Sequence, residues 1–386
     1  MPEVSADIIV VGAGVAGATT AAVLSRQGWR VLLLDARSDC APVFKAEKIL
    51  HDELVLLREC RLLEPLLPYA GLISELCEAY DGRIFRRNRV EQIGITYPDL
   101  VNTLRANLPP EVETGIGRVT HIAGDGNNQC VELDDGDVLT ARLVVLACGI
   151  GGSLPASLGL RRHVIQKEQC VTLGFNVVAT SRPFPFETVT YFPSDAADCI
   201  DYLTLFKIRD TMRANLFTFR PGNHPWIREF HKTPSLLLER ALPQLTRVTG
   251  EFKVVGKVDC GRMDLYRMEG TMPDGVVLVG DALQSACPSS GLGLKKAFTD
   301  VRVLAECVPA WFSTPGMSAA KLSAFYDHPR KRAMDAYVLR DAHDRRSLAC
   351  DPSPRWRIRR ALLHLRWNLP LPKFAVRVAR RLSRKP

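Results

Sequence analysis

Three glycines near the N-terminus have the spacing of a turn that binds dinucleotide phosphates. Gly12, Gly14 and Gly17 follow the apolar run 8–11 and precede the alanine-rich segment 18–26. The uninterrupted, β-branched run predicts a buried parallel strand, and the segment after the glycines predicts a helix. Gly12 permits a tight turn, Gly14 leaves room for a pyrophosphate against bare backbone, and Gly17 lets helix and strand pack closely. The free N–H groups at the helix start would bind the phosphates.

A carboxylate follows at the distance that such a turn requires. Residues 31–34 predict a second apolar strand that ends at Asp35, and an acid about twenty residues after the glycines can accept hydrogen bonds from both ribose hydroxyls. Strand, glycine turn, helix, strand and terminal acid fall within one unit of about thirty residues, which makes the motif far more specific than the glycines alone.

A second glycine-bearing stretch lies far downstream, at 275–300. An apolar strand ends at Asp281, and a loop leads into a helix expected to reach about residue 307. The loop contains Pro288, Gly291 and Gly293. Loops at the carboxyl ends of parallel strands bind ligands. Asp281 could therefore bond a ribityl hydroxyl, and the glycine backbone could approach a flat ring because no Cβ intervenes.

Two lysines, Lys295 and Lys296, fall in the first turn of the second helix. The helix dipole disfavours cations at that position. A nearby anion would explain them, and the alternative is that both point into solvent at small cost.

The elements after Asp35 must position these two stretches. Lys45, Glu47 and Lys48 lie in the connection to an apolar-periodic helix at 53–60, and a solvated helix entry is the alternative to a functional role for them. Polar and apolar residues then alternate at 82–94, a helix is predicted at 97–108, and a β-meander at 111–147. The last strand of the meander is wholly apolar and should rejoin the parallel sheet.

The central part of the chain predicts a second lobe. Strand-like runs occur at 170–178, 188–192, 202–208 and 214–219, which suits an antiparallel sheet. A short helix is predicted at 236–242, capped by Ser235 and ended by Pro243. A further strand is predicted at 252–259.

Length and composition describe an ordinary globular protein. A chain of 386 residues exceeds the length for which one core usually suffices, and 46% hydrophobic with 24% charged residues is typical of globular domains. No apolar run is long enough to cross a bilayer, and the N-terminus predicts a strand and not a signal peptide. The eleven cysteines form no Cys-x-x-Cys pair or Cys/His cluster, so the sequence predicts a reduced, cytoplasmic protein without a metal site.

Basic charge is concentrated at the C-terminal end. Residues 353–386 hold eleven of the 51 Lys and Arg residues and no acid, so the remainder carries 40 basic residues against 42 acidic ones. Trp356, Leu363 and Trp367 recur among arginines at near-helical spacing, and the mixture resumes at 374–382. A basic amphipathic helix with Trp predicts peripheral contact with an anionic membrane surface. The alternative is a helix that packs on the body and exposes its arginines. Nucleic-acid binding is not predicted, because no recognisable module accompanies the basic segment.

With both glycine-bearing stretches in view, most of residues 5–310 resembles the group A flavoprotein monooxygenases, the p-hydroxybenzoate-hydroxylase-like superfamily. The first glycine turn matches the family's first fingerprint, and the stretch 280–293 matches its second, more specific one. Family members bind FAD, take electrons from NADH or NADPH, and insert one oxygen atom from O2 into a substrate that is often aromatic. The resemblance implies an α/β fold, with a Rossmann-like FAD-binding domain, an interleaved antiparallel-sheet substrate domain and a helical C-terminus.

The resemblance also assigns residues to the cofactor. Asp35 would hold the adenosine ribose, and Val119 would lie near the adenine. Arg37 and Lys48 would line the FAD path, and Asp281 would hold the ribityl chain. The full set implied to bind FAD is Gly12, Ala13, Gly14, Gly17, Asp35, Ala36, Arg37, Lys48, Val119, Gly280, Asp281, Pro288, Gly291, Gly293 and Leu294.

The flavin ring would lie at the start of the second helix, with its N1–C2 edge facing the backbone of 291–294. Reduced flavin carries negative charge at that edge, so the helix terminus and Lys295 would stabilise it electrostatically. Tyr191, Tyr202 and Phe206 are candidates for the wall of the substrate cavity, and core packing is the alternative for each.

Several positions depart from the family's pattern. The family commonly has Glu in place of Asp35, and its middle Asp-Gly motif reads Cys148-Gly149 here. The His and Asn of its second motif are Gln284 and Lys295. A reductase or dehydrogenase of the geranylgeranyl-reductase-like branch therefore stays an alternative to a monooxygenase, as does an FAD-binding protein without catalysis. Halogenation is less favoured, because a Trp-x-Trp-x-Ile-Pro motif is absent.

These assignments divide the chain into three parts. The FAD-binding domain is expected at 1–80, 97–165 and 260–310, the substrate domain at 81–96 and 166–259, and a helical region with the basic tail at 311–386. The expected partner is a small-molecule substrate. NADH or NADPH would be a transient electron donor, because the chain has one dinucleotide fingerprint and no second one.

Overall fold

A parallel sheet carries both glycine-bearing turns at the ends of its strands. The computed structural model describes residues 5–151, 153–194 and 198–368. Strands β6 (Val112–Ile116), β2 (Val31–Asp35), β1 (Ala6–Val11) and β9 (Val138–Leu146) lie in that order and are parallel, and β15 (Val276–Leu278) pairs in parallel with the end of β9. Strands β7 (Val119–Gly124) and β8 (Gln129–Leu133) continue from β9 as an antiparallel meander. β6, predicted as part of that meander, pairs instead with β2.

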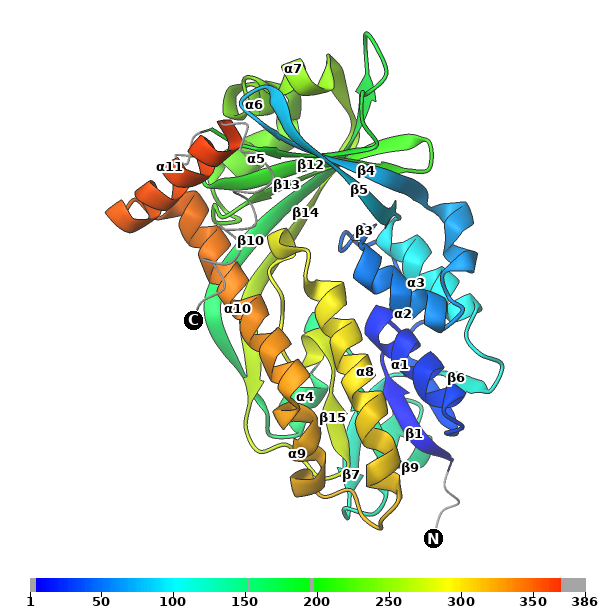
Figure 1. Cartoon of the computed structure of the whole chain (residues 1–386). Coiled ribbons are helices and arrows are strands. Elements are labelled where there is room, and N and C mark those ends of the chain that lie inside the picture. The colour runs from blue at the N-terminus through cyan, green and yellow to red at the C-terminus, as the bar shows by residue number, and fades with distance from the viewer. Residues whose placement is uncertain (1–4, 152, 195–197, 369–386) are drawn as a thin grey trace.

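Apolar side chains on both faces explain why these strands are buried. Helices α1 (Val15–Arg26) and α8 (Gly293–Phe312) pack side by side on one face (Figure 1), where Ile8 and Val10 share a core with Leu304. On the other face, Ile9 packs with Val131 of the meander. Further elements surround this unit: α2 (His51–Glu59), a 3₁₀ segment (Glu64–Tyr69), α3 (Tyr97–Ala106), a 3₁₀ turn (Gly149–Gly151) and α4 (Leu154–Ser157).

A second sheet lies across the carboxyl ends of the first. Its order is β14 (Phe252–Glu269), β10 (Arg161–Ala179), β13 (Thr211–Thr218), β12 (Ile200–Ile208), β11 (Thr188–Phe192), β4 (Gly71–Tyr80), β5 (Arg83–Gly94) and β3 (Lys48–Ile49). Neighbouring strands are antiparallel except β11 and β4. The long strands β10 and β14 run from this sheet down the flank of the first unit (Figure 1).

The two faces of the second sheet have different surroundings. Alternate residues such as Leu203, Leu205 and Leu216 form a core with the helices α5 (Pro225–Lys232), α6 (Pro234–Ala241) and α7 (Leu245–Thr249). Because side chains alternate along a strand, the residues between them face the first unit. This inner face includes Tyr202, Thr204 and Phe206 of β12 and Arg213, Asn215 and Phe217 of β13.

The second sheet includes several segments that were expected in the FAD-binding domain, among them β3 and the first residues of β10. β4 was expected with the first unit, which was set to end at residue 80, but β4 hydrogen-bonds to β5 and β11 in the second sheet. Residues 260–269 likewise continue β14 and pair with β10. Helix α6 begins at Pro234 after Thr233 and has no side-chain cap, so the cap predicted at Ser235 is wrong. Helices α5 and α7 were not predicted.

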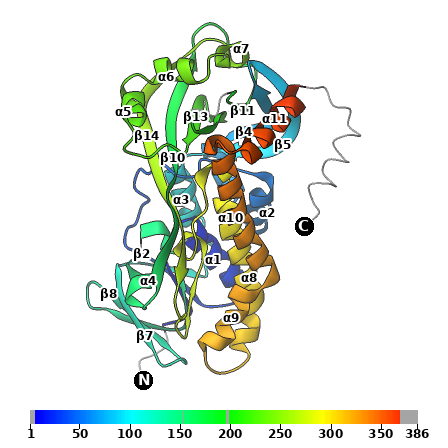
Figure 2. The same cartoon turned by 90° about the vertical axis from the view of Figure 1, so that its left-hand side faces the viewer.

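The C-terminal helices join both units. α9 (Ala319–Asp327) and α10 (Pro329–Cys350) follow α8, and α10 runs alongside α8 as far as the second sheet (Figure 2). In α11 (Pro354–Asn368), Trp356 is buried, and the Trp367 ring stacks 4.6 Å from Phe192 and 5.5 Å from Phe85. The basic segment predicted at 374–382 lies outside the described residues. Within the described residues, no helix combines the length and the apolarity that crossing a membrane needs.

Candidate functional site

The first glycine turn requires glycine at two positions. Gly12 has φ +102°, and a Cβ there would lie 2.7 Å from the carbonyl oxygen of Ala147. A Cβ on Gly17 would lie 1.7 Å from the carbonyl oxygen of Gly12, so α1 passes directly over the end of β1. Gly14 has room, since its nearest neighbour would be the Tyr97 hydroxyl at 3.5 Å. α1 begins after Gly14 without a side-chain cap, which leaves first-turn N–H groups for a ligand.

Asp35 is the last residue of β2, and three N–H donors of the protein hydrogen-bond to its carboxylate. Oδ2 accepts from the Ala13 N–H at 2.7 Å and from Arg105 Nη2 at 2.9 Å, while Oδ1 accepts from the Arg37 N–H at 3.1 Å. Arg105 also donates to the carbonyl oxygens of Ala13, Arg37 and Ser38. Arg37 thus acts through its backbone, and its side chain is exposed, as is Ala36. The sequence has no motif that marks Arg105, a single arginine in the last turn of α3.

The second glycine turn meets the first in space. Gly280 has φ +59°, its N–H donates to Asp300 Oδ2 at 2.8 Å, and its carbonyl accepts from Lys296 Nζ at 3.1 Å. A Cβ on Gly280 would lie 3.4 Å from the Cβ of Ala16 in the first turn of α1. The two turns therefore converge at the carboxyl ends of β1 and β15. Burial raises the pKa of Asp281, with Lys296 and Lys45 opposing that shift.

A buried network of four charges supports this turn. Asp300 lies 3.0 Å from Lys296 Nζ and 2.7 Å from Lys331 Nζ, and Lys331 continues to Asp335 at 3.2 Å. Burial disfavours the charged form of Asp300, but the two lysines outweigh it, and its pKa is lowered. Helices α8 and α10 are thereby joined directly behind Gly280.

Lys295 has a carboxylate of the chain as its partner. Its Nζ donates to Asp52 Oδ2 at 2.6 Å at the start of α2, and both side chains are exposed. The lysine beside the glycine turn is its neighbour Lys296. The helix start has a different titratable group, because Glu53 accepts from the Leu50 N–H at 2.6 Å and from the Lys295 backbone N–H. Burial raises the pKa of Glu53 to about 7.

The loop before α8 presents bare backbone. Pro288 opens a 3₁₀ turn (Pro288–Ser290), and Gly291 follows with φ +65°. Apart from Gly291 itself and the residues on either side of it, no part of the described chain lies within 4 Å of a Cβ built on Gly291. Gly293 starts α8 without a side-chain cap, and Leu294 packs into the core beneath. The Tyr202 hydroxyl of the second sheet donates to the Ser289 carbonyl oxygen at 2.8 Å, which ties the inner face to this loop.

The remaining predicted residues divide between the two units. Val119 is buried with Leu34, at the end of β2 that carries Asp35. Lys48 belongs to β3, the edge strand of the second sheet, and its Nζ lies 3.5 Å from Thr204 Oγ1 and 5.5 Å from the centroid of the Phe206 ring. Among the predicted wall residues, Tyr202 and Phe206 lie on the inner face, whereas Tyr191 packs in the outer core.

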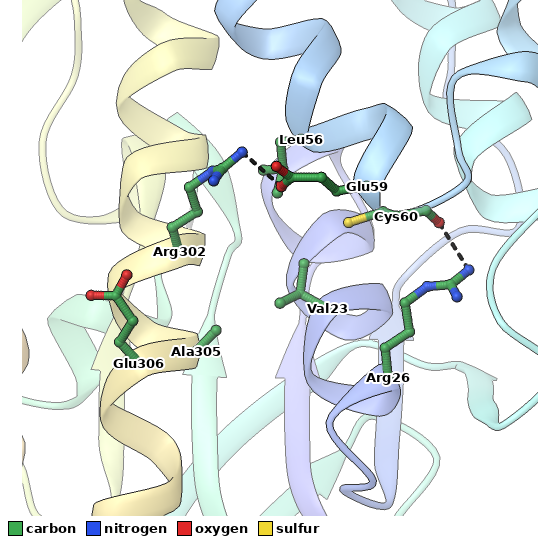
Figure 3. Close-up of a pocket in the computed structure, with 8 residues that line it drawn as sticks. All are labelled: Val23, Arg26, Leu56, Glu59, Cys60, Arg302, Ala305 and Glu306. Atoms are coloured by element: carbon green, nitrogen blue, oxygen red, sulfur yellow. Dashed lines mark hydrogen bonds and ion pairs between the residues drawn. The ribbon is translucent and has the colours of Figure 1, made fainter.

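A separate hollow lies on the surface between α1, α2 and α8 (Figure 3). Its charged side chains are already paired, since Arg302 Nη2 lies 2.8 Å from Glu59 Oε2 and Arg26 donates to the Cys60 carbonyl oxygen at 2.9 Å. It is lined by side chains outside both glycine turns, so we do not assign it to the site.

The converging turns fit an extended dinucleotide. Gly14 and Gly293 begin helices that lack side-chain caps, so each offers N–H groups to an anion or a carbonyl. Asp35, whose carboxylate is fixed by Arg105, is an acid of the kind that binds ribose hydroxyls after such a turn, and the open backbone at Gly291 suits a flat ring. No cluster of potential metal ligands occurs in the described ranges.

Comparison with known proteins agrees with this geometry. The family described as "FAD binding domain" matches residues 5–340. The chain is 26% identical to Digeranylgeranylglycerophospholipid reductase 1 of Methanopyrus kandleri, over 86% of this chain and 88% of that protein. It is 24% identical to Monooxygenase 2 of Arabidopsis thaliana, over 79% and 77%.

A solved structure shares the fold. The p-nitrophenol 4-monooxygenase PnpA from Pseudomonas putida DLL-E4 superimposes with a TM-score of 0.72 at 19% identity, covering 92% of both chains. The match of the family over most of the chain, together with the two converging glycine turns, leads to one conclusion. The chain belongs to the FAD-binding domain family and is a flavoprotein oxidoreductase of the group A monooxygenase family, with FAD as its cofactor.

Proposed function

We propose that this flavoprotein uses NADH or NADPH and O2 to hydroxylate a small substrate held on the inner face of the second sheet. The observation that carries the proposal is the contact between that face and the loop at 288–292 before α8. There the Tyr202 hydroxyl donates to the Ser289 carbonyl oxygen at 2.8 Å. A substrate beside Tyr202 would lie next to the start of α8. When bound, FAD supplies the electron transfer and the oxygen chemistry, and the protein supplies binding and orientation.

The residues around the turns then have separate tasks. The uncapped start of α1 at Gly14 would hold the pyrophosphate, and Asp35, held by Arg105, would bind the adenosine ribose. Asp281 would bond the ribityl chain, and the start of α8 would stabilise negative charge on the reduced ring. We assign the parallel sheet with α1 and α8 to FAD and the second sheet to the substrate.

Two measurements test the proposal in sequence. The purified protein, reconstituted with FAD, should show the flavin absorption spectrum. It should then consume O2 and NADH or NADPH in step with the appearance of a hydroxylated product. NAD(P)H oxidation that yields only hydrogen peroxide with every substrate offered would contradict the hydroxylase assignment.

A second candidate is an FAD-dependent reductase that saturates a carbon–carbon double bond. The specific observations in its favour are the 26% identity to the Methanopyrus kandleri reductase and the absence of the Asp-Gly motif at Cys148-Gly149. Anaerobic turnover separates the two functions, because a reductase needs no O2 and a hydroxylase stops without it.

Peripheral membrane contact through α11 is a further proposal. Trp356 and Trp367 face the body, but Ile358, Leu362 and Leu365 on another side of the helix are 60%, 61% and 54% exposed. Their spacing places them on one stripe, and arginines flank it. An apolar stripe among arginines suits an anionic membrane surface.

Sedimentation with vesicles tests the membrane contact. The protein should sediment with phosphatidylserine-containing vesicles at low salt and remain in the supernatant with neutral ones. A triple change of Ile358, Leu362 and Leu365 to Ser should reduce sedimentation severalfold. Equal sedimentation of the triple variant would contradict a role for the stripe.

A further inference from the structure

The inner face of the second sheet carries a lysine whose charge nothing in the described chain balances. Lys48 Nζ has Thr204 Oγ1 at 3.5 Å and the Phe206 ring at 5.5 Å as neighbours, and no carboxylate within ion-pair distance. Glu47, the adjacent acid, pairs instead with Arg213, whose Nε lies 2.9 Å from Glu47 Oε2. Burial alone lowers the pKa of Lys48 to about 8, which agrees with the lack of a balancing acid nearby.

The neighbouring charges on this face are paired among themselves. Arg213 joins Glu47 at 2.9 Å and Asp259 at 2.8 Å, and its guanidinium lies over the Phe44 ring at 5.1 Å. A cation that is already bonded to two carboxylates has little affinity left for a third. Lys48 is therefore the group on this face that is available to a ligand anion.

An unpaired acceptor lies beside the lysine. Asn215 of β13 is directly opposite Thr204 of β12, and side chains of opposed residues lie on the same face. Asn215 is 6% exposed, and its Oδ1 has no hydrogen-bond partner in the described structure. Its amide group also hydrogen-bonds to the Glu47 carboxylate, which requires the nitrogen to face Glu47 and so leaves the oxygen directed elsewhere. A buried acceptor without a partner is costly unless a ligand supplies the donor.

Tyr202 connects this face to the loop at 288–292 that precedes α8. Tyr202 and Thr204 point the same way from β12, about 7 Å apart along the strand, and the Tyr202 hydroxyl bonds to the loop at Ser289. A ligand that bonded both Lys48 and Asn215 would thus extend toward that loop.

From this arrangement we infer that the protein selects a substrate with a carboxylate, bound by Lys48 and the Thr204 hydroxyl, and an O–H or N–H donor, bound by Asn215 Oδ1. This inference deepens the proposed function by naming the substrate class, and it rests on the inner face being the substrate site. Charge-assisted hydrogen bonds in a partly buried site are strong and directional, so the acid group would set the orientation of the rest of the substrate.

Equilibrium binding to the FAD-loaded protein tests the inference without turnover. Benzoate, 3-aminobenzoate and the neutral isostere benzamide are titrated at pH 7, and the change in flavin absorbance is followed. Benzoate should bind at least about tenfold more tightly than benzamide, because a hydrogen bond to a charged group contributes about 1.5–3 kcal/mol. 3-Aminobenzoate should bind more tightly than benzoate, because its amine can donate to Asn215.

Matched variants locate the effect. Lys48→Met should reduce benzoate affinity about tenfold or more and leave benzamide affinity unchanged, while Lys48→Arg should keep most of the preference for the acid. Lys253→Met removes an exposed lysine at the far end of β14 and should change neither affinity. If Lys48→Met does not fold, the comparison of acid with amide in the unaltered protein still decides the matter.

The results that would overturn the carboxylate-binding inference differ from those that would overturn the hydroxylase proposal. Equal affinity for benzoate and benzamide, no saturable benzoate binding, or unchanged benzoate affinity in Lys48→Met would each overturn the assignment of Lys48. Equal affinity for benzoate and 3-aminobenzoate would overturn that of Asn215. None of these four results would stop O2-dependent hydroxylation of a neutral substrate, and a preference for acids would survive if turnover proved to be reductive.

Discussion

The guanidinium of Arg105 connects α3 to two other segments of the chain. It bonds the Asp35 carboxylate, the Ala13 carbonyl in the first glycine turn, and the carbonyls of Arg37 and Ser38. Asp35 is therefore oriented before any ligand binds, and a pre-oriented group loses less entropy on binding. The orientation of Asp35 therefore depends on this arginine, even though no sequence motif includes it.

We expect Arg105→Leu to weaken FAD binding about tenfold or more, because it frees Asp35 and leaves three carbonyl groups without a donor. FAD titration of the apoprotein, followed by flavin fluorescence, measures the dissociation constant. Arg30→Leu is the control, since Arg30 makes an exposed pair with Asp7 at 3.3 Å. Equal constants for Arg105→Leu and the unaltered protein would refute the role.

The raised pKa of Glu53 should make the stability of the protein depend on pH. This pKa is raised by burial from 4.5 to about 7, so the folded state holds a proton that the unfolded state releases at lower pH. The protein therefore loses stability as pH rises from about 4.5 to about 7. Glu53→Gln should remove that loss, and its stability relative to the unaltered protein should rise by up to about 3 kcal/mol between pH 4.5 and pH 8.

Urea unfolding at several pH values checks this difference. Glu59→Gln, at an exposed position on the same helix, is the control and should show no such trend. A constant difference between Glu53→Gln and the unaltered protein across that range would contradict the raised pKa.

At the scale of elements, the network of Lys296, Asp300, Lys331 and Asp335 joins α8 to α10 behind the second glycine turn. The Asp300 carboxylate also accepts a hydrogen bond from the Gly280 N–H. The position of the glycine turn and the packing of α8 on α10 are therefore coupled. A buried network of this kind is costly to break, since removal of one member leaves the other charges unbalanced.

Asp300→Asn should accordingly lower the free energy of unfolding by about 3–5 kcal/mol, because two buried lysines lose their shared counter-charge. Arg302→Met, two residues along α8, breaks only the exposed pair with Glu59 and should cost no more than about 1 kcal/mol. Chemical denaturation of both variants measures the difference. Similar losses for the two would mean that the network contributes little.

At the scale of the whole molecule, β10 and β14 tie the two sheets into one body. The two strands pair with each other from Arg161 and Glu269, beside the first unit, to Ala179 and Phe252 in the second sheet. α10 adds a second connection by packing on both α8 and β12. Neither unit can lose its structure without disrupting these shared strands.

We therefore expect one unfolding transition and not two. Far-ultraviolet circular dichroism and tryptophan fluorescence should give the same urea midpoint, since Trp29 and Trp311 report on the first unit and Trp226 on the second. Added FAD should raise the common midpoint, because it binds only the folded state. Two separate midpoints would show that the units unfold independently.

The sequence by itself determined those features whose causes are local. Gly12 and Gly17 must be glycine because backbone from the adjoining strand and turn lies too close for a Cβ. Their spacing within one strand–turn–helix unit is enough to predict this requirement. The strands β1, β2 and β12 were likewise predictable, because their alternation or continuity of apolar residues reflects burial of their own faces.

Only the tertiary structure decided which side chains meet. Lys295 and Lys296 are consecutive, and each step along a helix turns the side chain by about 100°, so the packing of α8 on α1 and α10 determines that Lys296 faces Gly280 while Lys295 reaches Asp52. For the same reason, the sequence could not predict which sheet β4 joins, which groups Arg105 contacts, or that the charge of Lys48 is unbalanced. Each depends on contacts between segments far apart in the chain, and a periodic pattern shows which face of an element is buried but not which other element covers it.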